Sequence, residues 1–275
     1  NVAYFDTALK DELIERNRLL DRLPQALADD EFKMYLQPKV DMETRGVIGA
    51  EALVRWEHPE LGFVSPAQFI PLFEREGCIY DVDRAIWEKA CAFIGSRRRR
   101  GLPVFPLSVN VARADLYEPD LVESLCDMAK RHGVRPGELH LEVLERAWAK
   151  DSQTACEAFG RLRECGFPIE MDDFGTGESS LALLADLPVD VLKLDRAFVN
   201  RVLEGPRSLG IIRCIIELAR TLGMSVVAEG VETEEQQDAL VSLGCRFAQG
   251  FLYYKPQAAE TFRDLAVPLE PPFAK

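Results

Sequence analysis

Two adjacent aspartates, Asp172 and Asp173, stand in the stretch IEMDDFGTGESSL, between an apolar run and a glycine-rich turn. Adjacent carboxylates repel, and each raises the pKa of the other unless a positive charge holds both. A protein kinase carries the same Asp-Phe-Gly triplet but also needs a Gly-rich loop, a strand lysine and an H-R-D loop upstream, which this chain lacks. A Walker loop is excluded because no lysine follows Gly177.

The elements that must position this pair follow a repeating pattern, in which an apolar run ends in a polar residue and precedes a helical stretch. The eight runs are FKMYLQPKV, GVIGAEALVRW, VFPLSVNV, ELHLEVLE, FPIEMDD, VDVLKLD, SVVAEGVE and RFAQGFLYY. Alternating strands and helices predict parallel βα units, and eight strands in about 250 residues predict one closed (β/α)8 barrel. We expect helices over Pro66–Glu76, Val82–Arg100, Leu116–His132, Gln153–Cys165, Ser180–Leu187, Ser208–Leu222 and Glu234–Leu243.

The first connection is different from the others. Only Asp41-Met42-Glu43-Thr44-Arg45 separates the first two strands, whereas a parallel crossover needs a dozen or more residues. The sequence therefore predicts a hairpin, with the first strand antiparallel to the second.

Active sites of such barrels lie at the C-terminal ends of the strands. The polar residues at those ends, with the reversed first strand included, are Gln37, Glu51, Asn110, Glu142, Asp172, Asp173, Lys193, Asp195, Glu229 and Gln249. Any one acid could simply be solvated or cap a helix. As a set, the carboxylates would repel one another unless cations neutralise them, and oxygen ligands suit Mg²⁺ or Mn²⁺ rather than zinc.

The two aspartates also have an expected geometry. Asp172 should face the barrel mouth, and Asp173 would face the other way if the strand continued. We expect the strand to break at Gly175-Thr176-Gly177 so that Asp173 turns back. One carboxylate could then bridge two metals about 3.5–4 Å apart, a geometry that serves displacement at phosphorus.

Composition limits the function classes. The net charge of −13 over 275 residues argues against a nucleic acid polymer or an anionic membrane as partner. The 7 cysteines form no paired motif, which favours a reducing cytoplasm, and no apolar run is long enough to cross a membrane. The chain begins with Asn1 rather than Met, so we expect a fragment of a longer protein.

Seven motifs resemble, in order, those of EAL domains, the bacterial cyclic di-GMP phosphodiesterases. The first is Glu51-Ala52-Leu53, followed by Val54-Arg55-Trp56; the others are SVN, LEVLE, DDFGTGESSL, LKLDRAFV, VVAEGVET and QGFLYYKP. The resemblance spans about residues 25 to 262. It implies a (β/α)8 TIM-like barrel with a reversed first strand. It also implies hydrolysis of one phosphodiester bond of cyclic di-GMP to the linear dinucleotide pGpG.

The resemblance implies roles for individual residues. A pair of Mg²⁺ or Mn²⁺ ions would be held by Glu51, Asn110, Glu142, Asp172, Asp173 and Glu229. Catalysis would rest on Glu229 as general base, Lys193 near the attacking water, and Asp173. Substrate contacts would come from Gln37, Leu53, Arg55, Glu145, Asp195 and Gln249, with Glu145 anchoring the loop after the two aspartates.

The resemblance also implies an organisation and partners. We divide the chain into a linker helix over residues 1–28, a phosphodiesterase barrel over 29–265 and a tail over 266–275. The linker resembles the segment that joins a GGDEF domain to an EAL domain, so an upstream GGDEF or sensor module is expected. Family members commonly pair, and a C2 homodimer is therefore expected. We expect no membrane contact by this fragment.

Three residues depart from the family pattern: Glu178 replaces an aromatic residue, and Leu144 and Arg146 replace Thr and Ser. These departures keep open an inactive or weak cyclic di-GMP receptor. An unrelated barrel enzyme of the enolase or aldolase kind would explain Lys193 but not the adjacent aspartates. The complete set of metal ligands favours the enzyme.

Overall fold

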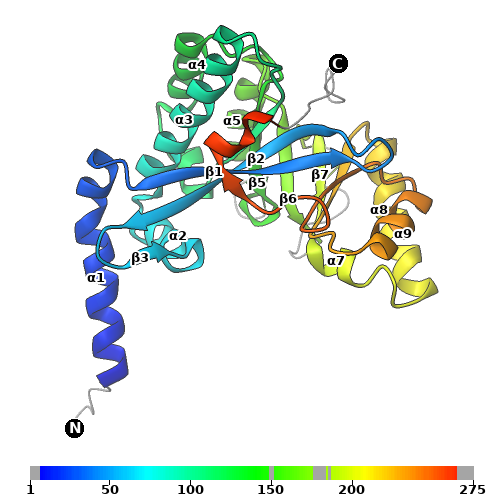
Figure 1. Ribbon diagram of the computed structural model, residues 1–275, viewed down its shortest axis with the longest axis horizontal. Helices are drawn as coiled ribbons and strands as arrows, with labels where there is room; N and C mark the ends of the chain where they lie inside the picture. Colours follow the sequence, from blue (N-terminus) through cyan, green and yellow to red (C-terminus); the bar gives the residue numbers. More distant parts are fainter. Residues whose placement is uncertain (1–6, 149–151, 176–183, 185–186, 265–275) are drawn as a thin grey trace.

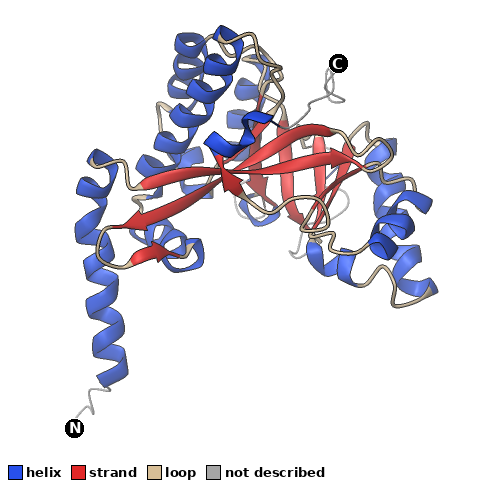
Figure 2. Ribbon diagram, in the orientation of Figure 1, coloured by secondary structure: helices blue, strands red, loops and turns tan. Residues whose placement is uncertain are grey.

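The computed structural model describes residues 7–148, 152–175, 184 and 187–264 (Figures 1 and 2). Within them, the closed barrel consists of β1 (Phe32–Asp41), β2 (Val47–His58), β4 (Leu107–Asn110), β5 (Leu139–Leu144), β6 (Ile169–Phe174), β7 (Val191–Leu194), β8 (Ser225–Glu229) and β9 (Phe247–Gln249). Two short strands extend the sheet, β3 (Gly62–Val64) beside β2 and β10 (Gln257–Ala258) beside β1.

The reversed first strand is confirmed. β1 runs antiparallel to both of its barrel neighbours, β2 and β9, and the other neighbouring barrel strands are parallel. The hairpin turn is closed by Asp41, whose Oδ1 accepts hydrogen bonds from the backbone N–H groups of Glu43 and Thr44 at 2.9 and 3.1 Å. The turn is too short to carry a crossover helix, so the chain has to reverse there.

Helices cover the outside of the barrel. They are α1 (Thr7–Ala28), α2 (Pro66–Glu76), α3 (Ile79–Arg99), α4 (Leu121–His132), α5 (Ser152–Glu164), α7 (Arg196–Asn200), α8 (Pro206–Thr221) and α9 (Glu234–Ser242), with short 3₁₀ turns η1 (Arg113–Tyr117), η2 (Glu145–Ala147) and η3 (Ala259–Asp264). No helix within the described part of the chain is both long and apolar enough to span a membrane.

Two helix predictions need comment. The helix expected over Leu116–His132 is split into η1 and α4, because Pro119 has no N–H group and disfavours helical geometry at Glu118, whose ψ is 123°. The helix expected over Ser180–Leu187 falls mostly outside the described residues.

Helix α1 lies on the edge of the fold rather than in it. Its C-terminal half buries Leu19, Leu23 and Ala26 in a cluster that includes Trp56 and Phe69. Its N-terminal half extends away from the barrel, at the lower left of Figure 1, and exposes Leu13 and Ile14. The apolar contacts of α1 with the barrel therefore come from its C-terminal half, while Arg16, nearer the middle, pairs with Glu76 of α2.

The end of β9 packs against the segment after β8, and this packing fixes the neighbouring Gln249. A Cβ atom at Gly250 would lie 2.1 Å from the carbonyl oxygen of Val231 and 2.4 Å from its nitrogen. Both atoms belong to the backbone, so neither can swing aside. Only glycine fits this position without moving the chain.

Gly250→Ala is therefore expected to destabilise the protein by about 1–3 kcal/mol, the usual effect of overpacking. Gly160→Ala is the matched control, because a Cβ there meets nothing within 4 Å in helix α5 and alanine favours the helix. Urea unfolding measures both variants. Equal free energies of unfolding for the two would contradict the packing argument.

Candidate active site

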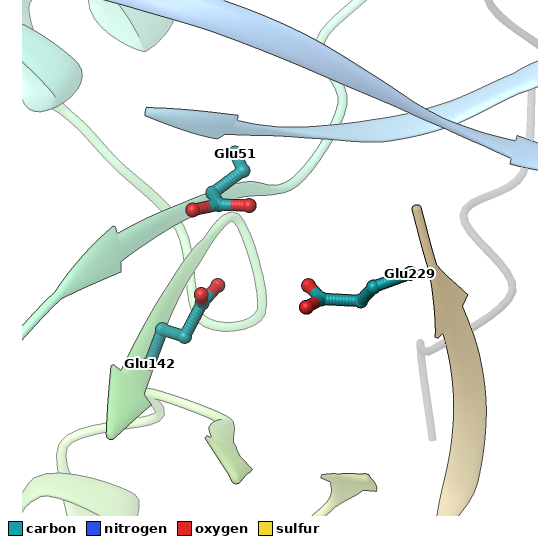
Figure 3. Close-up of side chains that lie close together, drawn as sticks. All are labelled: Glu51, Glu142 and Glu229. Atoms are coloured by element: carbon teal, nitrogen blue, oxygen red, sulfur yellow. The ribbon is translucent and has the colours of Figure 1, made fainter. Parts of the chain in front are cut away.

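The barrel mouth gathers side chains from strands that are far apart in sequence. Glu51 from β2, Glu142 from β5 and Glu229 from β8 point toward one another across the opening (Figure 3). One carboxylate oxygen from each lies within 4.8 Å of the others. A second group with the same spacing contains Asp172, Asp173 and Glu229. The strand-end carboxylates expected from the sequence are thus brought together, and Glu229 belongs to both groups.

Lys193, on β7, lies between these acids and is 1 % exposed. Its Nζ is 2.6 Å from Glu229, 3.2 Å from Asp172 and 3.4 Å from Glu51, and it also contacts Glu142. Burial alone would lower the pKa of Lys193, but the four carboxylates raise it well above the ordinary value. One ammonium group therefore holds together a cluster of four acids.

Two glutamines complete this rim. The Nε2 of Gln249 donates to Glu51 Oε2 at 2.7 Å and to Gln37 Oε1 at 3.0 Å. Gln37 in turn donates to the backbone oxygen of Tyr254 at 3.3 Å. Since Gln37 stands directly opposite Glu51 in the β1–β2 ladder, the reversed strand contributes to the same mouth.

The adjacent aspartates lie at an irregularity of strand β6 that the sequence did not predict. Strand β6 ends at Phe174, directly before Gly175 as expected, but its pairing with β7 has a register shift between Met171 and Phe174. Asp173 itself adopts the left-handed conformation, with φ of 55°. A bulge adds one residue and changes the face that follows it. The bulge therefore redirects Asp173 before the chain reaches Gly175, whereas Thr176 and Gly177 of the expected turn lie outside the described residues.

The site shifts the pKa values of its acids. Burial, reinforced by Asp172 and Glu51, raises the pKa of Glu229 to about 8 although Lys193 opposes this. Burial and the charges of Asp172 and Asp195 raise the pKa of Asp173 to about 6. Burial and the charge of Glu51 raise the pKa of Glu142 well above its ordinary value. Too much negative charge is present for one lysine to balance.

These residues fit divalent metal ions. The donors are all oxygens, as Mg²⁺ and Mn²⁺ prefer. The ammonium group of Lys193 already pairs with Glu51 and Glu229, so these acids accept a positive charge between them. The buried carboxylate of Glu142 is not fully hydrogen-bonded by the described residues, since its Oε2 has no hydrogen-bond partner among them. Two overlapping carboxylate groups could hold two cations.

Two pockets open beside this cluster. One, of about 240 Å³, is lined by Gln37, Asp172, Lys193, Glu229 and Gln249 among others. The other, of about 260 Å³, is lined by Arg55, Asn110, Leu144 and Arg146 among others. Both pockets include Glu51 and Leu53, so they meet on either side of this stretch of β2.

The remaining predicted site residues lie at varying distances from the cluster. Asn110 lines the second pocket at the end of β4. Arg55 lines the same pocket and its guanidinium lies over the ring of Tyr35 at 5.7 Å. The Oε2 of Glu145 accepts a hydrogen bond from Gly175 N at 2.7 Å, as expected for a loop anchor. Asp195 caps α7 through Ala197 N at 2.8 Å and also raises the pKa of Asp173.

Several pocket residues were not predicted. Glu74 and Asp83 come from helices α2 and α3, and Arg196 and Phe251 follow strand-end residues by one or two positions. The last two could have been found by extending each strand end by two residues. The helix residues carry no local signal, because only tertiary packing brings them to the mouth.

Of the three residues that depart from the family pattern, Leu144 and Arg146 line the second pocket. The third, Glu178, lies outside the described residues.

Comparisons with known proteins were made against this geometry. The family model described as the EAL domain matches residues 20–256. The chain is 37 % identical over 257 residues to the bifunctional diguanylate cyclase/cyclic di-GMP phosphodiesterase MucR of Pseudomonas aeruginosa, covering 94 % of this chain and 38 % of MucR. It is 36 % identical to the cyclic di-GMP phosphodiesterase RocR of the same organism, covering 87 % of this chain and 61 % of RocR.

Solved structures agree with the fold. The MucR phosphodiesterase in complex with c-di-GMP superposes with a TM-score of 0.84 at 38 % identity, covering 89 % of this chain and 99 % of that one. The EAL enzyme Bd1971, bound to cAMP and cyclic di-GMP, gives 0.86 at 32 % identity, covering 95 % and 70 %. The first curated relatives are longer, and this chain spans about two fifths of their length.

The acids whose pKa values are raised predict a pH effect on the metal-free protein. In EDTA, the melting temperature is expected to fall between about pH 5 and about pH 9. The pKa values of Glu229 and Asp173, about 8 and about 6, exceed their ordinary 4.5 and 3.8. The folded state therefore binds more protons than the unfolded state in this range, and stability decreases as they leave.

Circular dichroism melts at stepped pH measure this effect. Acids with lowered pKa, such as Glu170, titrate below this range and do not interfere. Added Mg²⁺ is expected to flatten the profile, because a cation replaces the protons. A melting temperature that is level or rising with pH in EDTA would contradict the assignment.

Proposed function

The chain belongs to the EAL domain family, and we propose that it hydrolyses one phosphodiester bond of cyclic di-GMP to the linear dinucleotide pGpG. The observation that carries this proposal is the pair of carboxylate groups that share Glu229 around Lys193. The phosphodiesterase names of MucR and RocR and the c-di-GMP complex of MucR support it.

The proposed metal ligands are Glu51, Asn110, Glu142, Asp172, Asp173 and Glu229. When bound, two Mg²⁺ or Mn²⁺ ions would lower the pKa of a water molecule and offset charge on the phosphate. Asp172 and Asp173 would hold the ions through their carboxylate oxygens. Glu229 would also be a ligand, since it belongs to both carboxylate groups.

The chain's own residues supply the proton transfer. Glu229 would accept the proton of the attacking water, because its carboxylate belongs to both acidic groups at the mouth and lies beside Lys193. Lys193 stays protonated because four acids surround it. Its ammonium group would orient the water or stabilise the charge that develops on the phosphate.

The two pockets suit a ligand with two similar ends. They meet at Glu51 and Leu53, where the scissile phosphate would lie. Arg55 would donate to a phosphate or a guanine, since its planar guanidinium forms paired hydrogen bonds. Carboxylates such as Glu74, on the wall of the same pocket, can accept the N–H donors of guanine. Gln37, Asp195 and Gln249 would contact the ligand near the metals.

A binding module without turnover is the second candidate. Leu144 and Arg146 both line the pocket beside Arg55, so the departures from the family pattern face the proposed ligand. Leu144 and Arg146 would then change how tightly the pocket holds the ligand, while the carboxylate cluster stays the same. The intact carboxylate cluster favours catalysis over binding alone.

The wider setting is also part of the proposal. The projecting α1 would continue into an upstream GGDEF or sensor module, because its N-terminal half makes little contact with the barrel. The domain would act in the cytoplasm as a homodimer, with residues 29–265 as the catalytic barrel and 266–275 as a tail. A nucleic acid polymer is not a proposed partner, since the net charge is −13.

Incubation with cyclic di-GMP and Mg²⁺ or Mn²⁺, followed by nucleotide chromatography, tests the function. Wild type is expected to yield pGpG. Glu51→Ala and Asp172→Asn are expected to lose about 100-fold or more in rate, because removal of a direct ligand exceeds the usual effect of its supporting residues. Glu204→Gln, on an exposed residue, is the control. Binding without turnover in wild type would favour the receptor instead.

Arg55→Lys tests the substrate contact. We expect KM for cyclic di-GMP to rise about tenfold, with a smaller change in kcat, since lysine cannot form the paired hydrogen bonds. Arg163→Lys is the control, because Arg163 pairs with Asp190 on the surface. Steady-state kinetics measures both, and an unchanged KM in Arg55→Lys would refute the contact.

A further inference from the structure

A second polar layer lies directly beneath the carboxylate cluster, and the proposed mechanism does not use it. Lys39, Ser108, His140 and Glu170 each precede or follow a mouth residue by two positions, on β1, β4, β5 and β6. Side chains two apart on a strand face the same side, so these four point into the barrel one step deeper. The other side of this layer is apolar, formed by Val191, Val227 and Phe247.

The four polar side chains form one connected network. Lys39 Nζ donates to Glu170 Oε2 at 2.5 Å and to Ser108 Oγ at 2.7 Å. Ser108 Oγ donates to Glu170 Oε1 at 2.8 Å, and His140 Nδ1 lies 2.7 Å from the same oxygen. All four residues are 2 % exposed or less. Lys39 is therefore held rigidly, without help from solvent.

This network touches the proposed metal site through Glu142. Lys39 Nζ lies 3.9 Å from Glu142 Oε2, the oxygen that has no hydrogen bond from a described residue. The other oxygen, Oε1, contacts Lys193 on the opposite side. Glu142 is fully buried between two lysines, one above it and one below. A buried carboxylate needs compensating charge to remain in place.

Lys193 and Lys39 differ in the acids that compensate their charges. Lys193 shares its charge among four carboxylates that bound cations would also claim. Lys39 has Glu170 as its close counter-ion and, of the mouth acids that the structure describes, pairs with Glu142 alone. Its position does not depend on whether the mouth holds cations. A fixed charge on the inner side of Glu142 would keep Oε1 directed outward.

We propose that Lys39 is a positioning residue for metal binding: held by Glu170 and Ser108, its charge keeps the Glu142 carboxylate oriented toward the mouth. The inference rests on the proposed function only in taking Glu142 as a ligand. Glu170 and Ser108 act through Lys39, and none of the three touches substrate. The simpler alternative is an ion pair that only stabilises the fold.

A paired substitution separates these two roles. Lys39→Met alone would leave Glu170 buried and unpaired, which commonly unfolds a protein. Lys39→Met combined with Glu170→Gln removes both charges, and glutamine can still bond Ser108 and His140. Replacing both partners of a buried ion pair is often neutral for stability. The double variant should therefore fold, yet lack the charge beneath Glu142.

Isothermal titration of nucleotide-free protein with Mn²⁺ provides the readout, with thermal melts alongside. We expect Mn²⁺ affinity to fall about 10- to 100-fold in the double variant, the usual effect of losing support behind a ligand. The melting temperature in EDTA should stay close to wild type. Lys33→Met with Asp30→Asn is the matched control, an ion pair of 3.0 Å on the surface. Wild-type Mn²⁺ affinity in a folded double variant would overturn the proposal.

Ser108→Ala is the second variant and decides the matter if the double variant melts far below wild type. It removes one hydrogen bond from Lys39 but retains every charge. A few-fold loss of Mn²⁺ affinity supports the proposal, and an unchanged affinity overturns it. Parallel assays with cyclic di-GMP test the proposed hydrolysis separately from the positioning role of Lys39. Wild type that binds Mn²⁺ but yields no pGpG refutes the function, whereas the affinity difference between variants still tests Lys39.

Discussion

The organisation of this protein depends on mutual repulsion among carboxylates that the barrel forces together. Glu51, Glu142, Asp172 and Glu229 come from four different strands, and each lies within 4 Å of the Lys193 ammonium. Such a cluster destabilises the fold unless cations neutralise it. The raised pKa values of Glu142 and Glu229 show that the negative charge exceeds the positive charge nearby. The site is thus built to bind cations rather than to stabilise the protein.

The reversed first strand makes this arrangement possible. Because β1 runs antiparallel to β2, Gln37 and Glu51 stand opposite each other, while Lys39 lies deeper in the barrel. Gln249 then joins Gln37 to Glu51 by hydrogen bonds. If the first strand ran parallel to its neighbours, the residues at its C-terminal end would lie at the mouth instead. The short turn at Asp41 decides which residues reach the mouth.

The interior has two layers with separate tasks. The outer layer carries the acids and Lys193. Bound cations would share these acids with the Lys193 ammonium group. The inner layer is half charged, around Lys39 and Glu170, and half apolar, around Val191 and Val227. The charged half lies one step beneath Glu142 and Asp172, since His140 and Glu170 precede these acids by two positions on β5 and β6. The two layers therefore meet at Glu142, which lies between Lys39 and Lys193.

The sequence by itself determined the barrel, the reversed first strand and the strand-end acids. Alternating apolar runs, a short first connection and local motifs are all properties of neighbouring residues. Tertiary structure alone decided that a bulge, with Asp173 at φ 55°, turns the second aspartate inward. It also decided that Asp83 reaches the pocket and that Lys39 lies beneath Glu142. These contacts join residues far apart in the chain, and barrel closure creates them, so no local pattern could reveal them.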